Sequence, residues 1–132
     1  MTEFSQVIAE HKSLKYLDVS ANRIRNRAFS KLFTAVQSPN SKVSTFHCRK
    51  NYFGGQRIDE ILHIRSRHLS VLDFSRNKLT EINGEILLKS VKANIFISKL
   101  ILNKNIFVSA NVINEVNEEC FQNVLIKQRI LS

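Results

Sequence analysis

The stretch Leu69-Ser-Val-Leu72-Asp-Phe74-Ser-Arg-Asn77-Lys-Leu79 decides the fold of this 132-residue chain. It reads as the frame Leu-x-x-Leu-x-Phe-x-x-Asn-x-Leu, with four apolar positions and one asparagine. Leu72 and Phe74 alternate with other residues, and this period of two predicts a strand with one buried face. Asn77 follows the strand, where the chain has to turn. A side-chain amide both donates and accepts hydrogen bonds, so an asparagine inside a turn can satisfy backbone groups on both sides.

The same frame occurs three more times in the chain. The other copies run from Leu14 to Ile24, from Val43 to Phe53 and from Ile97 to Phe107. Repeats therefore start near residues 14, 43, 69 and 97, and a constant period of roughly 20 to 50 residues is the signature of a solenoid. The recurring asparagines predict a structural ladder made of Asn22, Asn51, Asn77 and Asn105. The alternative for each of them is an ordinary exposed turn residue.

With these residues the chain resembles the leucine-rich repeat family, and it is most similar to the ribonuclease-inhibitor-like class. The resemblance covers about residues 2–125. It implies an α/β fold, a curved leucine-rich repeat solenoid with a parallel strand on the concave face and a helix on the convex face of each repeat. The alternative is an open doubly wound sheet, which also alternates strands and helices. Such a sheet would not require the same asparagine after every strand.

Apolar residues at helical spacing predict a helix before the first strand, over residues 2–11, and another over residues 27–37. Gly54-Gly55 and Asn83-Gly84 are expected to form the turns into the helices of the second and third repeats. Residues 124–131 fit the frame only in part. We expect a partial terminal strand there, and the alternative is the interruption of a longer array.

The whole chain, residues 1–132, is expected to form a single leucine-rich repeat domain, since its 43% hydrophobic content suffices for a packed core. No apolar run approaches about 18 residues, and the start of the chain lacks the pattern of a secretory signal. Cys48 and Cys120 occupy apolar positions, which predicts buried, reduced thiols. These features predict an intracellular location, in the cytoplasm or alternatively the nucleus.

The frame also predicts which side chains project outward from the sheet. Mixed charge beside an aromatic residue is typical of protein-binding surfaces, and solenoids commonly bind partners on an extended concave face. The candidate partner-binding residues are Tyr16, Asp18, His47, Arg49, Lys50, Val71, Asp73, Arg76, Lys99 and Lys104. For any one of them, the alternative is a solvated strand residue that contributes little to binding.

The sequence contains no convincing pattern for catalysis or metal binding. His47 and Cys48 are adjacent, but neighbouring residues of a strand face opposite sides of the sheet. Asp18 and Asp73 are two repeats apart, roughly 10 Å by strand spacing. The four histidines lack the spacing of metal ligands, and Gly54-Gly55 lacks the lysine of a phosphate loop. We therefore expect no enzyme activity, metal, cofactor or small-molecule substrate.

The formal net charge of +9 favours acidic partners. The preferred hypothesis is a non-catalytic interaction module or scaffold, a subunit or fragment of a larger intracellular assembly, that binds another protein through the concave face. The resemblance implies a second hypothesis, a regulator of a small GTPase or of actin assembly, because this class includes Ran GTPase-activating proteins and tropomodulin. Nucleic-acid association is the less favoured alternative, since only Tyr16 and Tyr52 are candidates for stacking on bases.

Overall fold

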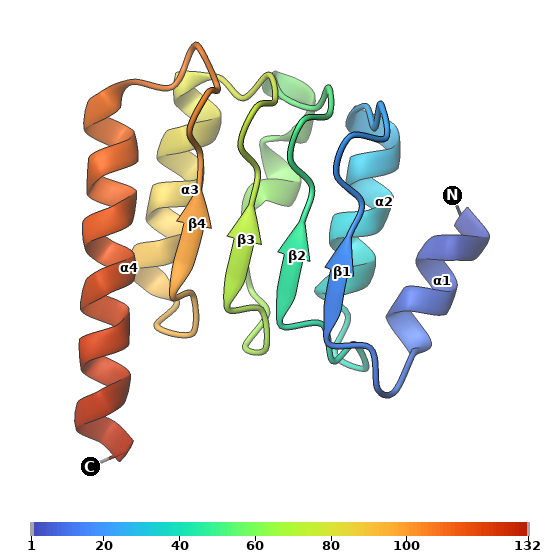
Figure 1. Ribbon diagram of the computed structural model, residues 1–132, viewed down its shortest axis with the longest axis horizontal. Helices are drawn as coiled ribbons and strands as arrows, with labels where there is room; N and C mark the ends of the chain where they lie inside the picture. Colours follow the sequence, from blue (N-terminus) through green and yellow to red (C-terminus); the bar gives the residue numbers. More distant parts are fainter. Residues whose placement is uncertain (1, 132) are drawn as a thin grey trace.

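The computed structural model of the protein describes residues 2–131. Four short strands form one parallel sheet, in which they lie side by side in sequence order. The strands are β1 (Tyr16–Asp18), β2 (Thr45–His47), β3 (Val71–Asp73) and β4 (Lys99–Ile101). Figure 1 shows this sheet face-on, with the return segments behind it.

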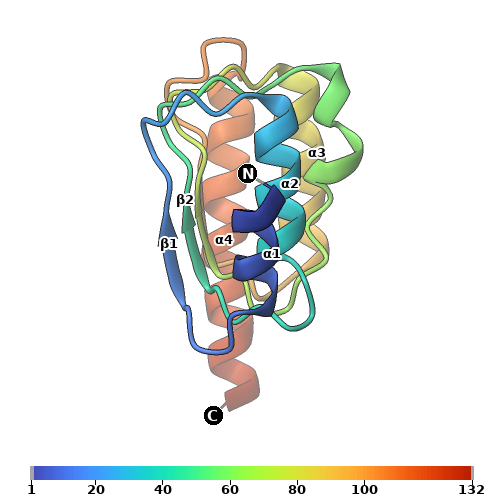
Figure 2. The same cartoon turned by 90° about the vertical axis from the view of Figure 1, so that its right-hand side faces the viewer.

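The return segments form a second layer on one side of the sheet, as Figure 2 shows. They are α1 (Thr2–Glu10), α2 (Asn26–Val36), η1 (Gln56–Ile58), η2 (Glu60–Leu62), α3 (Glu81–Ala93) and α4 (Ala110–Leu131). Neighbouring strands need about 4.8 Å of width and packed helices need 8–10 Å, which places the sheet on the inner side of the bend. The predicted α/β solenoid, with parallel strands on one face and helices on the other, is confirmed.

In the second, third and fourth repeats, the frame asparagine joins its own repeat to the repeat before it. The expected place of Asn22 in this ladder is wrong, because its side chain is exposed and reaches only carbonyl oxygens of its own turn. Asn51 Oδ1 accepts hydrogen bonds from the backbone N–H groups of Asn22 and Ile24, both at 2.9 Å. Its Nδ2 donates to the carbonyl oxygens of Val19 and Cys48, both at 3.2 Å. A single side chain therefore satisfies backbone donors and acceptors that belong to two successive turns.

Asn77 and Asn105 repeat this arrangement further along the stack. Asn77 Nδ2 donates to the carbonyl oxygens of Cys48 at 3.0 Å and Phe74 at 3.1 Å. Asn105 Nδ2 donates to the carbonyl oxygens of Phe74 and Leu102, both at 3.0 Å. Both asparagines are buried, so these amides replace the water that the turns would otherwise need.

Phe74 stands at the centre of an aromatic cluster in the core. Its ring makes edge-to-face contacts with four other phenylalanine rings, at centroid distances of 5.3–6.1 Å and interplanar angles of 84–89°. These rings belong to Phe29, Phe33, Phe46 and Phe53, and all five side chains are fully buried. The cluster ties α2 to the first three repeats, since edge-to-face pairs add to the free energy gained from burial alone.

The second repeat does not contain the expected α-helix. Two short 3-10 turns, η1 and η2, take its place. This repeat is the shortest, with 26 residues between its start at Val43 and the next at Leu69. Ile58 and Leu62 are nevertheless fully buried, so the tighter segment supplies the same apolar contacts to the core.

Asn83-Gly84 does not form the expected turn but lies in the first turn of α3. Thr80 Oγ1 accepts from the Asn83 N–H at 3.2 Å, and Asn83 Oδ1 accepts from the Thr80 N–H at 3.0 Å, which is a capping box. A Cβ added at Gly84 would lie 3.1 Å from side-chain carbons of Val108 and Val112. The pair thus starts a helix and lets α4 approach α3 closely.

The expected partial strand at residues 124–131 is wrong, because α4 continues through this segment. The sequence from residue 110 to residue 131 holds no glycine or proline to stop a helix. Asn123 anchors the helix, since its Nδ2 donates to the carbonyl oxygens of Val91, Asn94 and Ile97 at 2.9–3.1 Å. In Figure 2, α4 lies between the strand layer and the helix layer, where it covers the end of the stack.

Replacing Asn77 by leucine should lower the free energy of unfolding by about 1–3 kcal/mol, because buried carbonyl oxygens lose their donor. Asn22→Leu is the matched control: Asn22 is exposed, and its Nδ2 reaches only carbonyl oxygens of its own turn, those of Val19 and Ser20. It should cost less than half as much. Urea unfolding of both variants measures the difference, and equal effects would show that the ladder does not carry the stability.

Gly54→Ala should destabilise the chain by several kcal/mol, because a Cβ at Gly54 would overlap the carbonyl group of Lys78 in the next repeat. Gly55 also has a positive φ, of 98°, but a Cβ there would meet no atom within 4 Å. Gly55→Ala should therefore cost only the strain of that backbone conformation, roughly 1–3 kcal/mol. Thermal unfolding of the two variants compares them, and a similar loss in both would contradict the close approach.

Candidate functional site

The open sheet face carries the outward side chains of the four strands in continuous rows. The strand register pairs each outward residue with its counterpart in the neighbouring repeat. The first row is Tyr16, Thr45, Val71 and Lys99, and the second is Asp18, His47, Asp73 and Ile101. Six of these eight residues are candidates that the sequence frame predicted, and the register brings them together.

A contact chain of three side chains occupies the centre of this face. The rings of Tyr16 and His47 lie 5.3 Å apart between centroids. His47 Nδ1 is 3.8 Å from Asp73 Oδ2. Asp73 Oδ1 in turn accepts from the backbone N–H of Ser75 at 3.0 Å and from its hydroxyl at 2.6 Å. Asp73 is only 7% exposed, which corrects the expectation that it projects freely from the sheet. Its role here is to hold His47 and the following turn.

Asp18 keeps a charge at the edge of the same face. Hydrogen bonds from the hydroxyl and backbone N–H of Ser20 hold the pKa of Asp18 below its usual value. The Ser20 hydroxyl oxygen also accepts from the backbone N–H of Arg49 at 3.1 Å. Asp18, Arg49 and Lys99 are exposed, whereas Val71 is half-buried. The face therefore offers both signs of charge to a partner.

Three cations at equivalent positions of successive repeats have an unusual backbone conformation where the strands end, and Arg23 has the same conformation elsewhere in the first turn. Lys50, Arg76 and Lys104 have φ values of 54°, 57° and 64°, and Ala21 in the first repeat has 58°. At such angles a side chain costs roughly 1 kcal/mol, and glycine is preferred. All three cationic side chains are exposed, and none makes a salt bridge within residues 2–131. Charge is thus present at positions where the fold alone favours glycine.

The turn of the fourth repeat is one residue longer than expected. α3 begins four residues after Asn77, whereas α4 begins five residues after Asn105. Val108, at 7% exposure, fills the buried position that the frame assigned to Phe107, which is 66% exposed. Val108 N–H donates to the Asn105 carbonyl oxygen at 2.9 Å and closes a tight turn. Ile106, 84% exposed, and Phe107 form the corner of that turn.

Sequence reasoning missed this apolar corner and a second feature beside it. Lys78 Nζ lies 5.3 Å from the ring centroid of the exposed Tyr52. The available signal was the run Ile106-Phe107-Val108, in which three apolar residues compete for one buried position.

Two solved structures share this arrangement at low sequence identity. The structure of "Leiomodin-1 Actin-Binding Site 2 (ABS2)" superposes with a TM-score of 0.66 and 15% identity, over 99% of this chain and 80% of that one. The chain therefore has the ribonuclease-inhibitor-like leucine-rich repeat fold. The tropomodulin C-terminal domain of Caenorhabditis elegans gives a TM-score of 0.59 and 16% identity, over 98% of each chain. No protein-family model and no curated protein sequence matches this leucine-rich repeat chain.

Both cysteines of the leucine-rich repeat chain are free and buried, as predicted. Burial raises the pKa of the Cys48 thiol to about 12 and that of the Cys120 thiol to about 11. A thiol attacks as its thiolate, so neither side chain is activated as a nucleophile near neutral pH. Cys48 is fully buried behind the sheet, while the adjacent His47 faces the open side.

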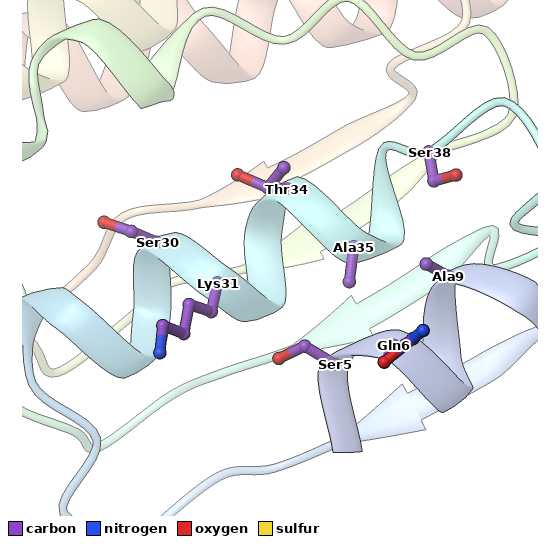
Figure 3. A pocket seen from close by; sticks show the side chains of 8 residues that line it. All are labelled: Ser5, Gln6, Ala9, Ser30, Lys31, Thr34, Ala35 and Ser38. Atoms are coloured by element: carbon purple, nitrogen blue, oxygen red, sulfur yellow. The ribbon is translucent and has the colours of Figure 1, made fainter. Parts of the chain in front are cut away.

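A shallow groove lies between α1 and α2, away from the open sheet face. Figure 3 shows its lining, which is mostly small: Ser5, Gln6, Ala9, Ser30, Lys31, Thr34, Ala35 and Ser38. These side chains do not combine an acid, a base and a nucleophile. Residues 2–131 contain no group of three metal-ligating side chains that could hold an ion. In the same range, no helix has the length and apolarity needed to cross a bilayer.

Iodoacetamide at about pH 8 should label the native chain very slowly, because both thiols are buried and protonated. Addition of urea should expose two reactive thiols per chain, which mass spectrometry counts. Both folded pKa values lie above the ordinary value of 9.0, so the folded state favours the neutral thiols. Their contribution to the free energy of unfolding is therefore complete below pH 9.0. It is lost as the pH rises through 11 to 12. Rapid labelling of the native chain would contradict this burial.

Proposed function

We propose that this leucine-rich repeat chain is a non-catalytic protein-binding module whose partner lies on the open sheet face. The observation that carries the proposal is the register, which makes one continuous surface of side chains from four repeats. An aromatic ring, an imidazole and charges of both signs occur together on it, as they do in protein interfaces. Neighbouring repeats are rigidly linked by the ladder, so this surface is preorganised for binding.

The chemistry of the face supports binding better than catalysis. His47 contacts Tyr16 and Asp73, but no activated nucleophile stands beside it, since the Cys48 thiol lies on the core side. A general base needs a proton to abstract within hydrogen-bond reach. The two free, buried thiols also fit the proposed intracellular location, where such thiols stay reduced.

Actin is the first partner to test. The leiomodin-1 structure is that of an actin-binding site, and it matches nearly all of this chain. This likeness favours the actin-assembly form of the regulator hypothesis, whereas no observation favours a small GTPase. Nucleic acid is the weaker alternative, because Lys78 already lies against the Tyr52 ring and Tyr16 contacts His47. These contacts reduce the area available for stacking on bases.

The chain should co-sediment with actin filaments, and the double variant Tyr16→Ser, Lys99→Glu should bind at least about tenfold more weakly. Both residues are exposed on the open sheet face, and aromatic residues often dominate binding energy. Sedimentation at a series of actin concentrations measures the dissociation constants.

The matched control is Ile82→Ser, Lys89→Glu, which replaces one large side chain by serine and reverses one charge at exposed positions of α3 on the helix side. It should bind like the unaltered chain. Equal weakening by both double variants would assign the effect to net charge rather than to the open sheet face. No co-sedimentation with filamentous actin, together with no binding of monomeric actin to the immobilised chain, would exclude actin as the partner.

A further inference from the structure

A second surface, which adjoins the open sheet face, lies at the turns that follow the strands. We name it the asparagine edge; it comprises residues 20–25, 49–55, 75–80 and 103–109. It forms the upper rim of the molecule in Figure 1. In both Figure 1 and Figure 2, the turn between β4 and α4 rises beyond the other turns of this rim.

Two apolar side chains of that raised turn lie outside the core. Ile106 and Phe107 are 84% and 66% exposed, and Val108 fills the core position beneath them. Corners of tight turns usually carry glycine, asparagine or aspartate. Two large apolar residues at such a corner therefore point to a partner that covers them, because exposed apolar surface of this kind marks interaction sites.

Cations and a tyrosine lie along the same edge as Ile106 and Phe107, which we call the tip. Leu79 N–H donates to Asn105 Oδ1 at 3.0 Å, which brings the turn of the third repeat against that of the fourth. Lys78, next to Leu79 in the chain, lies over the Tyr52 ring of the second repeat. Lys104 precedes the tip, and Arg76 N–H donates to the Asn103 carbonyl oxygen at 3.0 Å in the same register. Positive charge thus continues along the edge up to the tip.

We propose that the asparagine edge docks on an anionic lipid bilayer, with Ile106 and Phe107 inserted among the lipids and Lys50, Arg76 and Lys104 at the headgroups. The three cations occupy equivalent positions of successive repeats, so they present charge along a line rather than around a hollow. The turn that carries the tip rises beyond the other turns of the rim, as a membrane-inserting element must. Apolar insertion combined with basic residues supplies the two signals that reversible membrane binding requires.

An acidic protein is the competing partner for the same residues. A protein surface would need a pocket to receive the tip, and it would have to match the cations at fixed points. A fluid bilayer needs neither, since lipids rearrange around an inserted side chain and anionic headgroups are mobile. Tyr52, at 46% exposure, also suits a bilayer interface, where tyrosine is enriched.

The first test measures binding to vesicles of phosphatidylcholine with about 30% phosphatidylserine, compared with phosphatidylcholine alone. The chain should sediment with the anionic vesicles only, and raising the salt from about 0.05 M to about 0.5 M should release it. Absence of binding to the anionic vesicles at low salt overturns the proposal. In that case, binding to immobilised poly-glutamate is measured next. If the unaltered chain is retained and the double variant Ile106→Asn, Phe107→Gly is not, the asparagine edge binds an acidic protein instead.

A tryptophan reporter tests insertion of the tip directly. The chain contains no tryptophan, so Phe107→Trp introduces a single fluorophore at the tip. Its emission should shift to shorter wavelength with anionic vesicles and be quenched by brominated lipids. Phe121→Trp is the control, because Phe121 is 60% exposed but lies on α4, outside the asparagine edge. Vesicle binding without a shift at position 107, or with an equal shift at both positions, overturns insertion by the tip.

Two further variants separate the tip from the cations. Ile106→Asn, Phe107→Gly introduces residues that turns prefer, so it should fold normally while its partition coefficient on anionic vesicles falls about tenfold or more. The second variant is the triple substitution Lys50→Gly, Arg76→Gly, Lys104→Gly. Glycine removes the backbone strain at these positive-φ positions, and the loss of charge should weaken binding at low salt by about fivefold per cation.

The control for the cations removes the same charge from the opposite edge. Lys12→Gln, Lys15→Gln, Lys42→Gln alters exposed residues that precede β1 and β2. It should retain most of the binding, and urea unfolding should show all variants folded. If this control weakens vesicle binding as much as the glycine variant does, net charge rather than the asparagine edge explains the attraction, and the proposal fails.

Discussion

The stack depends on the buried asparagine amides that join one turn to the next. Each strand has only three residues, so the ladder hydrogen bonds within the sheet are few. The Asn51 side chain adds hydrogen bonds to the turn of the repeat before it, and Asn77 and Asn105 do the same further along. An orphaned polar group would be costly in these buried turns. The amides therefore fix the spacing and register on which both candidate surfaces depend.

The repeated frame made much of the fold predictable. A strand, a turn and an asparagine recur at the same spacing, so each copy supports the interpretation of the others, and the parallel strands occur where the frame placed them. The errors lie between the frames, where no repeat constrains the pattern. The dipeptide Asn83-Gly84 is typical of a turn, whereas Thr80 makes it the start of a helix. Residues 124–131 stay helical because Asn123 anchors α4 in a way that only the fold reveals.

The candidate surfaces were predictable in position more than in detail. Alternation along each strand indicated which side chains face outward, and the register places them in the expected rows. It did not indicate that Ser75 would bury the Asp73 carboxylate, because that contact depends on the path of the following turn. Nor did it choose between Phe107 and Val108 for one core position, since both are apolar and the choice depends on the length of the turn.

The extra residue in the β4–α4 turn shows where this fold tolerates change in length. The ladder holds Asn105 at the start of this turn. At its end, the Ser109 hydroxyl accepts from the Val112 N–H at 3.2 Å, and the Ser109 N–H donates to Glu81 Oε1 at 2.8 Å. Both anchors keep their hydrogen bonds although the segment between them is longer than in the third repeat. Loop closure costs little for each added residue once the ends are held. The segment between these anchors is therefore a natural position for grafting a foreign peptide onto a rigid scaffold.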